Sequence, residues 1–248
     1  MQPTITTHRN FLKDSLRLTI NFALTDQNKG LPAPALQKPY ASGKITELST
    51  PEAWPFHLDM SLRTAIMQRK SRRTFSKSPI SLDELSFLLW ATQGVRQPVN
   101  ESTAFRMVPS AGCRHAFETY LAVFNVQDLS PGVYRYLPVE HGLIYETEIS
   151  PARPLGAAAL NQSFVEKSSV VFIWSCLPYR MEWRYDLSAH RVIAMDAGHV
   201  CQNLYLACEA IHAGTCAIAA FHQEKMDAFV GVDGNDEFVI YMAPVGKQ

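Results

Sequence analysis

Four basic side chains crowd into the five positions from Arg69 to Arg73, and Ser71 lies among them. The stretch from 61 to 80 contains six basic residues and no acidic one, although the whole chain has 23 residues of each sign and no net charge. Guanidinium groups and a hydroxyl can together bind a phosphate or a similar anion. Runs of this kind also occur on solvated helix ends, so the cluster by itself leaves an anion site and a plain surface as alternatives.

Other common kinds of site are not supported by the sequence. It contains no G-x-G-x-x-G, no G-x-x-x-x-G-K-[ST], no H-E-x-x-H and no G-x-S-x-G motif. The five cysteines include no C-x-x-C pair and are odd in number, which favours reduced thiols in the cytoplasm over zinc ligands or disulfides. The zero net charge argues against a nucleic-acid partner, and the longest strongly apolar run, 170–174, is far too short for a membrane span.

One further polar pair lies in the strongest predicted helix, 190–213. Asp196 and His199 are three residues apart there, so their side chains could touch. We interpret His199 as a core histidine rather than a catalytic one, and Cys201 and Cys208 as packing residues.

The elements that must position these residues follow from periodicity and capping signals. Predicted helices are 10–24, 61–69, the stretch that follows the capping box Ser81–Glu84 and ends at Gly94, 190–213 and 223–230, with weaker candidates at 151–160 and 162–167. Predicted strands are 118–125, 133–137, 143–148, 170–176, 215–221 and 236–244.

This order lacks the regular alternation of a doubly wound chain, so it predicts an α+β fold in which helices cover a mixed sheet. The helix 190–213 is apolar nearly all round, which places it centrally or at a subunit interface. Five prolines between 32 and 55 rule out regular structure there. We therefore expect residues 1–57 to be an extension that wraps over the body or a partner subunit, and residues 58–248 to be one domain.

Several segments of that domain form an ordered series. They are RKSRRTF (69–75), SLDELSFLLWATQGV (81–95), RMVPSAG (106–112), MDAGHVCQNLYLACEAIHAGTCAIAAF (195–221) and DEFVIYMAPVGK (236–247). In order and spacing the series resembles the nitroreductase-like flavoproteins, and most closely their SagB-type dehydrogenase branch. The resemblance implies a sandwich with a mixed, mainly antiparallel sheet flanked by helices. It also implies a long central helix at the interface of a homodimer that binds FMN there.

The resemblance implies which residues hold the cofactor. The flavin-holding R-x-S-x-R segment corresponds to Arg69, Ser71 and Arg73, with Lys70 beside them. Independently of the family, arginine forks and a serine hydroxyl suit a phosphate that carries about two negative charges.

The other implied contacts come from three places along the chain. A segment that reaches the flavin from the other subunit corresponds to Pro109, Ser110, Ala111 and Gly112. The stretch along the ring edge near N5 corresponds to Ala219 and Ala220, and the C-terminal basic residue near the phosphate corresponds to Lys247. Small residues such as these two alanines let the backbone approach the ring.

The sequence departs from the SagB-type pattern at two places. Azoline dehydrogenases carry a Lys-Tyr pair before the long helix, and the matching catalytic positions here are Arg184 and Tyr185. Arginine is a poor base, so azole formation is in doubt, whereas Tyr185 could donate or relay a proton. After the PSAG segment, Arg114 and His115 could line the substrate side of the flavin or face solvent.

The function that this resemblance implies is an FMN-dependent oxidoreductase. Hydride would pass through flavin N5 from NAD(P)H or an organic donor to a small electrophilic acceptor such as a quinone or a nitro group. The alternatives are a peptide-tailoring, azoline-type dehydrogenase and a flavin-binding module that has lost catalysis. A nucleic-acid site at the arginines is the reading least favoured by the charge balance.

Overall fold

The computed structural model describes residues 4–40, 43–150 and 154–248. Its largest element is a seven-stranded sheet whose strand pairs are all antiparallel. In spatial order the strands are β1 (Ile45–Glu47), β6 (Gly142–Thr147), β5 (Gly132–Leu137), β4 (Phe117–Val123), β7 (Val170–Cys176), β9 (Phe238–Lys247) and β8 (Ala213–Thr215). Isolated parallel bridges, such as Ser71 with Thr215, add a parallel component, so the expected mixed, mainly antiparallel sheet is confirmed.

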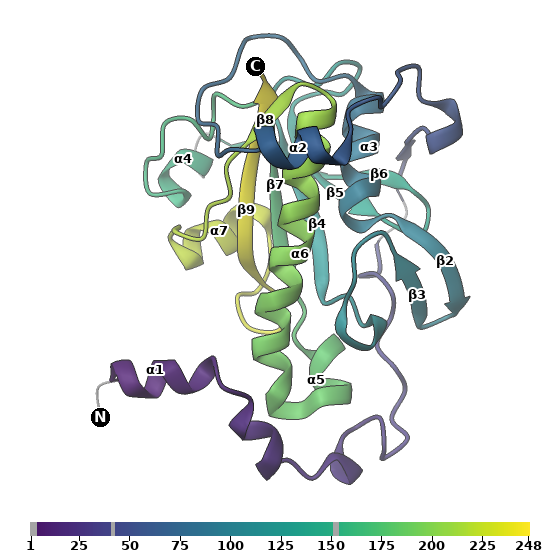
Figure 1. Cartoon of the computed structure of the whole chain (residues 1–248), viewed down its shortest axis with the longest axis vertical. Coiled ribbons are helices and arrows are strands. Elements are labelled where there is room, and N and C mark those ends of the chain that lie inside the picture. Colours follow the sequence, from purple (N-terminus) through teal and green to yellow (C-terminus); the bar gives the residue numbers. More distant parts are fainter. Residues whose placement is uncertain (1–3, 41–42, 151–153) are drawn as a thin grey trace.

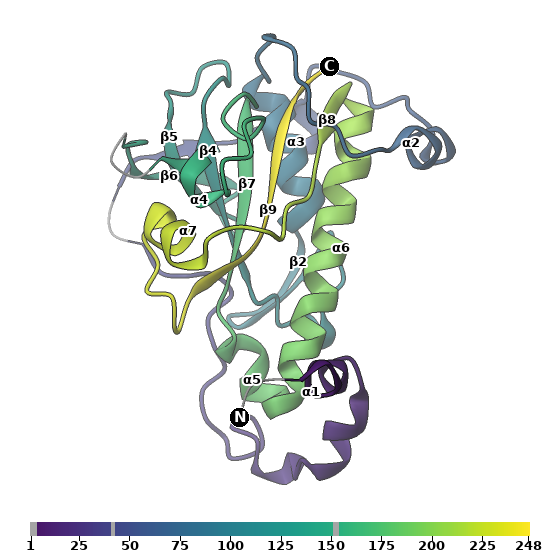
Figure 2. The same cartoon turned by 90° about the vertical axis from the view of Figure 1, so that its left-hand side faces the viewer.

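Helices cover both faces of this sheet. They are α1 (Ile5–Phe11), α2 (Leu62–Gln68), α3 (Leu82–Gln93), α4 (Leu155–Ala158), α5 (Tyr179–Tyr185), α6 (Ala189–Ala210) and α7 (Gln223–Val230). Figure 2 shows α3 and α6 on one side of the sheet and α4 and α7 on the other, each pair with its own apolar core. A separate hairpin of β2 (Val95–Asn100) and β3 (Thr103–Arg106) projects beside α3 (Figure 1).

Local sequence signals explain the main elements. Ser81 caps α3 by accepting from the backbone N–H of Glu84 at 3.1 Å, while Glu84 accepts from the N–H of Ser81 at 3.0 Å. Every residue of β7 is buried, as its apolar and β-branched run predicts for a central strand. Gly94 follows the last residue of α3 and has a negative φ, so it does not adopt the left-handed conformation. A glycine is needed at this position because a Cβ would lie 2.7 Å from the carbonyl oxygen of Trp90.

Two helix predictions are wrong. The predicted helix 10–24 is replaced by α1 and two short 3₁₀ turns, Asp14–Thr19 and Phe22–Leu24. None of these pieces buries a residue, and short helices depend on packing for stability. The predicted helix 162–167 does not form, and of the candidate at 151–160 only α4 does; residues 151–153 lie outside the described ranges. Leu160 and Asn161 both have positive φ, which stops the chain from continuing as a helix.

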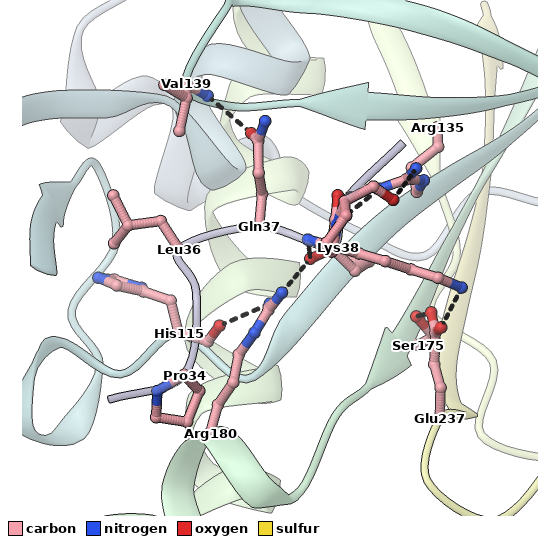
Figure 3. A network of polar contacts seen from close by, with 12 residues as sticks. Pro34, Leu36, Gln37, Lys38, His115, Arg135, Val139, Ser175, Arg180 and Glu237 are labelled. Carbon is pink, nitrogen blue, oxygen red and sulfur yellow. Dashed lines mark hydrogen bonds and ion pairs between the residues drawn. The ribbon is translucent and has the colours of Figure 1, made fainter. Parts of the chain in front are cut away.

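The N-terminal extension is attached to the body through its backbone. Arg106 donates to the carbonyl of Leu36 at 2.6 Å, and Arg135 donates to the carbonyl of Lys38 at 2.8 Å. Arg114 reaches the carbonyl of Pro34 at 3.2 Å. Figure 3 shows this segment, 34–39, crossing the cluster of buried side chains; we call it the strap.

Buried carboxylates complete the network under the strap. Glu118 accepts from the N–H of Lys38 at 2.7 Å and from Arg180 at 2.5 Å, and it lies 3.6 Å from Arg135. The ammonium of Lys38 contacts Glu237 at 2.5 Å (Figure 3). The strap is therefore held by ion pairs and hydrogen bonds to buried side chains rather than being a loose tail.

Two broader properties follow from the described residues. None of the helices in the described ranges is long and apolar enough to cross a membrane. In the same ranges, no cluster of three or more His, Cys, Asp or Glu side chains could hold a metal ion.

Candidate functional site

The basic segment lies along the edge of the sheet where β8 ends the strand order. The N–H of Arg72 donates to the carbonyl of Thr215 at 2.9 Å, and the N–H of Ser76 donates to the carbonyl of Lys247 at 2.8 Å. Both contacts fix the segment against β8 and β9. A groove of about 500 Å³ follows it, lined by residues 70–76 and Gln248.

The cations of this segment are mostly uncompensated. Arg72 lies 3.6 Å from the buried carboxylate of Glu209. In contrast, Arg69, Lys70 and Arg73 form no ion pair with any residue that the structure describes. An open groove with uncompensated positive groups is suited to bind an anion.

Tyr205 of α6 joins the basic segment to the chain after β8. Its hydroxyl lies 2.9 Å from the hydroxyl of Ser71 and accepts from the N–H of Ala217 at 2.8 Å. The guanidinium of Arg69 stands over the tyrosine ring at 5.2 Å from its centre. Tyr205 is not among the predicted site residues, because its partners Ser71 and Ala217 lie outside its helix and cannot be identified from the helix pattern.

The predicted residues Ala219 and Ala220 come two and three positions after Ala217, and both are exposed. Gln162 donates to the carbonyl of Ala220 at 3.1 Å, and Arg73 stands 5.9 Å over the ring of nearby Phe164. The structure thus brings the basic segment and the predicted ring-edge segment to one side of the fold.

Lys247 is held differently from the other predicted phosphate contacts. Its ammonium bonds to the carboxylate of Glu84 and, at 2.7 Å, to the carbonyl of Ile211. Its charge is therefore balanced by α3, and a role for Lys247 at a phosphate stays a prediction.

The second group of predicted residues gathers around the first half of α6. The N–H of Ala111 donates to the carboxylate of Asp196 at 3.3 Å, and the hydroxyl of Ser110 accepts from the N–H of His115 at 3.0 Å. Burial raises the pKa of Asp196, whereas its bonds with Ser110 and Ala111 act in the opposite direction. His199 is 3.7 Å from Asp196 but half exposed, so its interpretation as a core histidine is wrong.

Gly112 fits closely against the predicted catalytic pair. Its φ is 58°, in the left-handed region that favours glycine. A Cβ at this position would lie 2.6 Å from the hydroxyl of Tyr185 and 2.9 Å from Nε of Arg184. The guanidinium of Arg184 in turn stands 5.6 Å over the ring of Tyr185. Two sets of residues predicted separately, 109–112 and 184–185, therefore meet in space.

Arg114 and His115 do not face solvent, so that alternative is wrong. Both are buried, and Arg114 bonds to the carbonyls of Pro34 and Arg180 at 3.2 Å each. Burial lowers the pKa of His115 to about 3, and the guanidinium of Arg106 adds to this. His115 lines a groove of about 360 Å³ that also includes Pro109 and Ser110.

The basic segment and the residues around Ser110–Gly112 lie at different positions along the axis of α6. Asp196 marks one and Tyr205 the other, and nine residues of helix separate them by about 14 Å. Figure 1 shows α5 at one end of α6 and β8 with α2 at the other. Within a single chain the two groups of predicted residues therefore do not meet in one pocket.

Comparison with known proteins adds a family assignment to this geometry. Residues 66–247 match the model of the nitroreductase family. A candidate nitroreductase of Methanocaldococcus jannaschii is 30% identical over 190 residues, which cover 77% of this chain and 92% of that protein. The trifolitoxin operon protein TfxC of Rhizobium leguminosarum is 25% identical over 92% of this chain, and the match spans 66% of that protein.

Two solved structures share the fold. One is a candidate nitroreductase from Ralstonia eutropha, with a TM-score of 0.66 and 24% identity over 88% of this chain and 98% of that one. The other belongs to the Escherichia coli microcin synthetase complex with a truncated pro-peptide bound; it has a TM-score of 0.61 and 15% identity over 100% of this chain and 98% of that one. The α+β sandwich expected from the sequence is confirmed.

Proposed function

Because this chain belongs to the nitroreductase family of oxidoreductases, we propose that it is an FMN-dependent enzyme. FMN would supply the redox chemistry, taking up and releasing hydride at N5. The donor would be NAD(P)H or an organic molecule, and the acceptor a small electrophile such as a quinone or a nitro compound. The protein's part is to bind, orient and tune the cofactor.

The observation that carries this proposal is the groove beside residues 70–76. Lys70 and Arg73 line this groove without a carboxylate partner in the described residues, exposed Ser71 lies between them in the sequence, and Arg69, also without such a partner, directly precedes the groove. A phosphate provides acceptor oxygens for both guanidinium groups and for the hydroxyl of Ser71. The donor set therefore fits the phosphate and polar edge of FMN.

The residues after β8 fit the ring of the same cofactor. Ala219 and Ala220 are exposed and carry only methyl groups, so a planar ring can lie against their backbone. Arg69 adds a positive charge near the ring, which would stabilise a reduced, anionic flavin. Lys247 would take part only by sharing its ammonium between Glu84 and the phosphate.

A second copy of the chain would complete the site. The outward face of α6 carries Ala194, Met195, Gly198, His199 and Gln202, all exposed. A Cβ on Gly198 would meet no other atom within 4 Å, so this face is open and partly built from small residues. Two α6 helices could approach closely across it, and Pro109–Gly112 of one chain would then reach the basic groove of the other.

The pair beside Gly112 would act on the substrate side. Tyr185 is half buried and its hydroxyl adjoins the Ser110–Gly112 loop, so it can donate a proton to a bound acceptor. The guanidinium of Arg184 is suited to hold an anionic group or to orient the tyrosine.

The proposal is tested by FMN binding to the purified full chain. We expect a yellow protein with a flavin spectrum that NADH or NADPH bleaches without oxygen. Arg69→Ala should weaken FMN binding by about 1.5–3 kcal/mol, which is about tenfold or more in Kd. Arg17→Ala is the matched control, because it removes an arginine that pairs with Asp14 in the extension. A colourless protein that FMN cannot reconstitute would refute the proposal.

A peptide-tailoring activity is the second candidate, and the similarity to a trifolitoxin operon protein favours it. The arginine at position 184, in place of the lysine of azoline dehydrogenases, counts against it. Oxidation of an azoline-containing peptide by the reconstituted protein would select this candidate. FMN that stays oxidised with every donor tested would instead indicate a flavin-binding module without catalysis.

A further inference from the structure

We propose that Tyr205 is a positioning residue that holds three parts of the flavin site in one arrangement. The inference rests on the proposed function, since it concerns how the same site is organised. Tyr205 need not touch FMN itself; it acts through Ser71, Arg69 and the chain at Ala217.

The hydroxyl of Tyr205 lies between two backbone segments that are also joined, two residues from Ala217, by the hydrogen bond from the N–H of Arg72 to the carbonyl of Thr215. It accepts from the N–H of Ala217 at 2.8 Å and lies 2.9 Å from the hydroxyl oxygen of Ser71. Ser71 and Ala217 are far apart in the sequence but belong to the predicted phosphate and ring-edge segments. One oxygen atom therefore contacts both segments and adds a side-chain link, at Ser71 and Ala217, to the backbone bridge between Ser71 and Thr215.

The direction of these hydrogen bonds determines what Ser71 can do. An amide can only donate, so the oxygen of Tyr205 accepts from Ala217. Either hydroxyl of the Tyr205–Ser71 pair can donate. We assign the arrangement in which the tyrosine donates to the oxygen of Ser71, which leaves the serine hydrogen free to point outward. Because Ser71 is exposed to the groove, its free hydrogen is aimed at a bound acceptor. A chain of donors polarised in this way binds an oxyanion more strongly than an isolated serine.

The aromatic ring of Tyr205 contacts Arg69, which is a role separate from that of the hydroxyl. Arg69 stands over its face at 5.2 Å, a geometry in which the aromatic quadrupole attracts the cation. Arg69 forms no ion pair within the described residues, so the ring is its main restraint. The side chain of Tyr205 thus orients a donor with its hydroxyl and a cation with its ring.

Residues 218–220 connect Ala217 to the segment that is predicted to lie along the edge of the flavin ring. Ile218 exchanges backbone hydrogen bonds with Met242 at 2.8 and 3.1 Å, which ties the segment to β9. Ala219 and Ala220 follow without such a bond to the sheet and are exposed. Holding the N–H of Ala217 therefore fixes the start of the segment predicted to lie near N5.

Two variants separate the two tasks. Tyr205→Phe keeps the ring and removes the hydroxyl, and we expect its Kd for FMN to rise about tenfold, because the Ala217 N–H and Ser71 lose their common partner. Tyr205→Leu also removes the surface under Arg69. We expect its bound FMN to lose about tenfold of its preference for the reduced state, which is a fall of about 30 mV in the midpoint potential of a two-electron couple.

A double-mutant cycle tests whether the hydroxyl acts through Ser71. We expect the loss of FMN affinity in Ser71→Ala with Tyr205→Phe to be smaller than the sum of the two single losses, because both changes weaken the same chain of donors. Tyr134→Phe is the control, since its hydroxyl donates to the carbonyl of Ser130 at 2.9 Å in a different part of the sheet. That control should leave FMN affinity and potential unchanged.

The outcomes distinguish this inference from the proposed function. If the wild-type chain does not bind FMN, the proposed function itself fails. If the wild type binds FMN and Tyr205→Phe binds it equally well, only the positioning role is refuted. Fully additive losses of FMN affinity in the cycle would refute the claim that Tyr205 acts through Ser71. An unchanged flavin midpoint potential in Tyr205→Leu would refute the claim that the tyrosine ring positions Arg69.

Discussion

His115 offers a quantitative test of the interior beneath the strap. Its imidazole is buried, and its pKa falls from 6.5 to about 3. Burial is the main cause, and the guanidinium of Arg106 is the next, while a hydrogen bond with the backbone of Ala104 acts in the opposite direction. Folding therefore requires the neutral form of this histidine.

The direction and size of the pH effect follow from this pKa. Between pH 6.5 and about 3 the unfolded chain binds a proton at His115 that the folded chain excludes, so stability falls as the pH falls through that range. Above the unfolded pKa the contribution is fully present. Integrating the difference from about pH 7 to about pH 5 gives a loss of about 2 kcal/mol from this one residue.

Urea unfolding at both pH values measures the effect, with His115→Asn as the reference variant. Asparagine does not titrate, and it tolerates the positive φ of 47° at this position better than most residues do. We expect the wild type to lose about 2 kcal/mol more than the variant between the two pH values. Other shifted groups, such as His141, remain in both proteins and cancel. Equal losses in the two proteins would refute the assignment of a buried neutral imidazole.

Two further changes test the fold. Glu118→Gln should destabilise the chain by about 3–5 kcal/mol in urea unfolding, because it leaves buried Arg180 without its carboxylate at 2.5 Å. Glu146→Gln is the control, since its partly exposed carboxylate should matter far less; equal costs would contradict the reasoning. Ser81→Ala should cost about 1 kcal/mol in thermal unfolding by removing the capping box of α3, and an unchanged midpoint would show that the cap is not needed.

The sequence was sufficient to predict a helix or strand where one local signal dominated. The predicted strand 170–176 and helix 223–230 match β7 and α7 to the residue, because a short apolar run and a clear amphipathic stretch need no distant partner. The hairpin of β2 and β3 was missed, since Pro98 and its polar neighbours are typical of a loop. The helix α5 was missed for a different reason: its seven residues are too few to show a period.

The candidate site could be predicted only in part, for a similar reason. The basic segment and the loop 109–112 stand out by residue type, but their partners are remote in the sequence. Tyr205 meets Ser71 across 134 positions, and the pattern of its own helix does not identify that partner. The available signal was its hydroxyl in a mostly apolar helix, because a buried tyrosine needs a hydrogen-bond partner.

The strap is an irregular segment that belongs to the domain because of its contacts with buried side chains. The prediction of an extension at residues 1–57 rests on its prolines, and residues 32–40 are irregular as predicted. The expectation of no regular structure up to residue 55 is wrong, because β1 (Ile45–Glu47) and the 3₁₀ turn Pro51–Ala53 form there. The irregularity of the strap leaves backbone carbonyls free, and buried Arg106, Arg114 and Arg135 each donate to one of them in addition to acceptors of the body. The strap thus supplies acceptors to guanidinium groups that it helps to bury, and a buried donor left unsatisfied would cost about 1–3 kcal/mol or more. Residues 34–39 therefore belong energetically to the domain they cross, and they stabilise the turn at Arg114 that follows the predicted flavin loop.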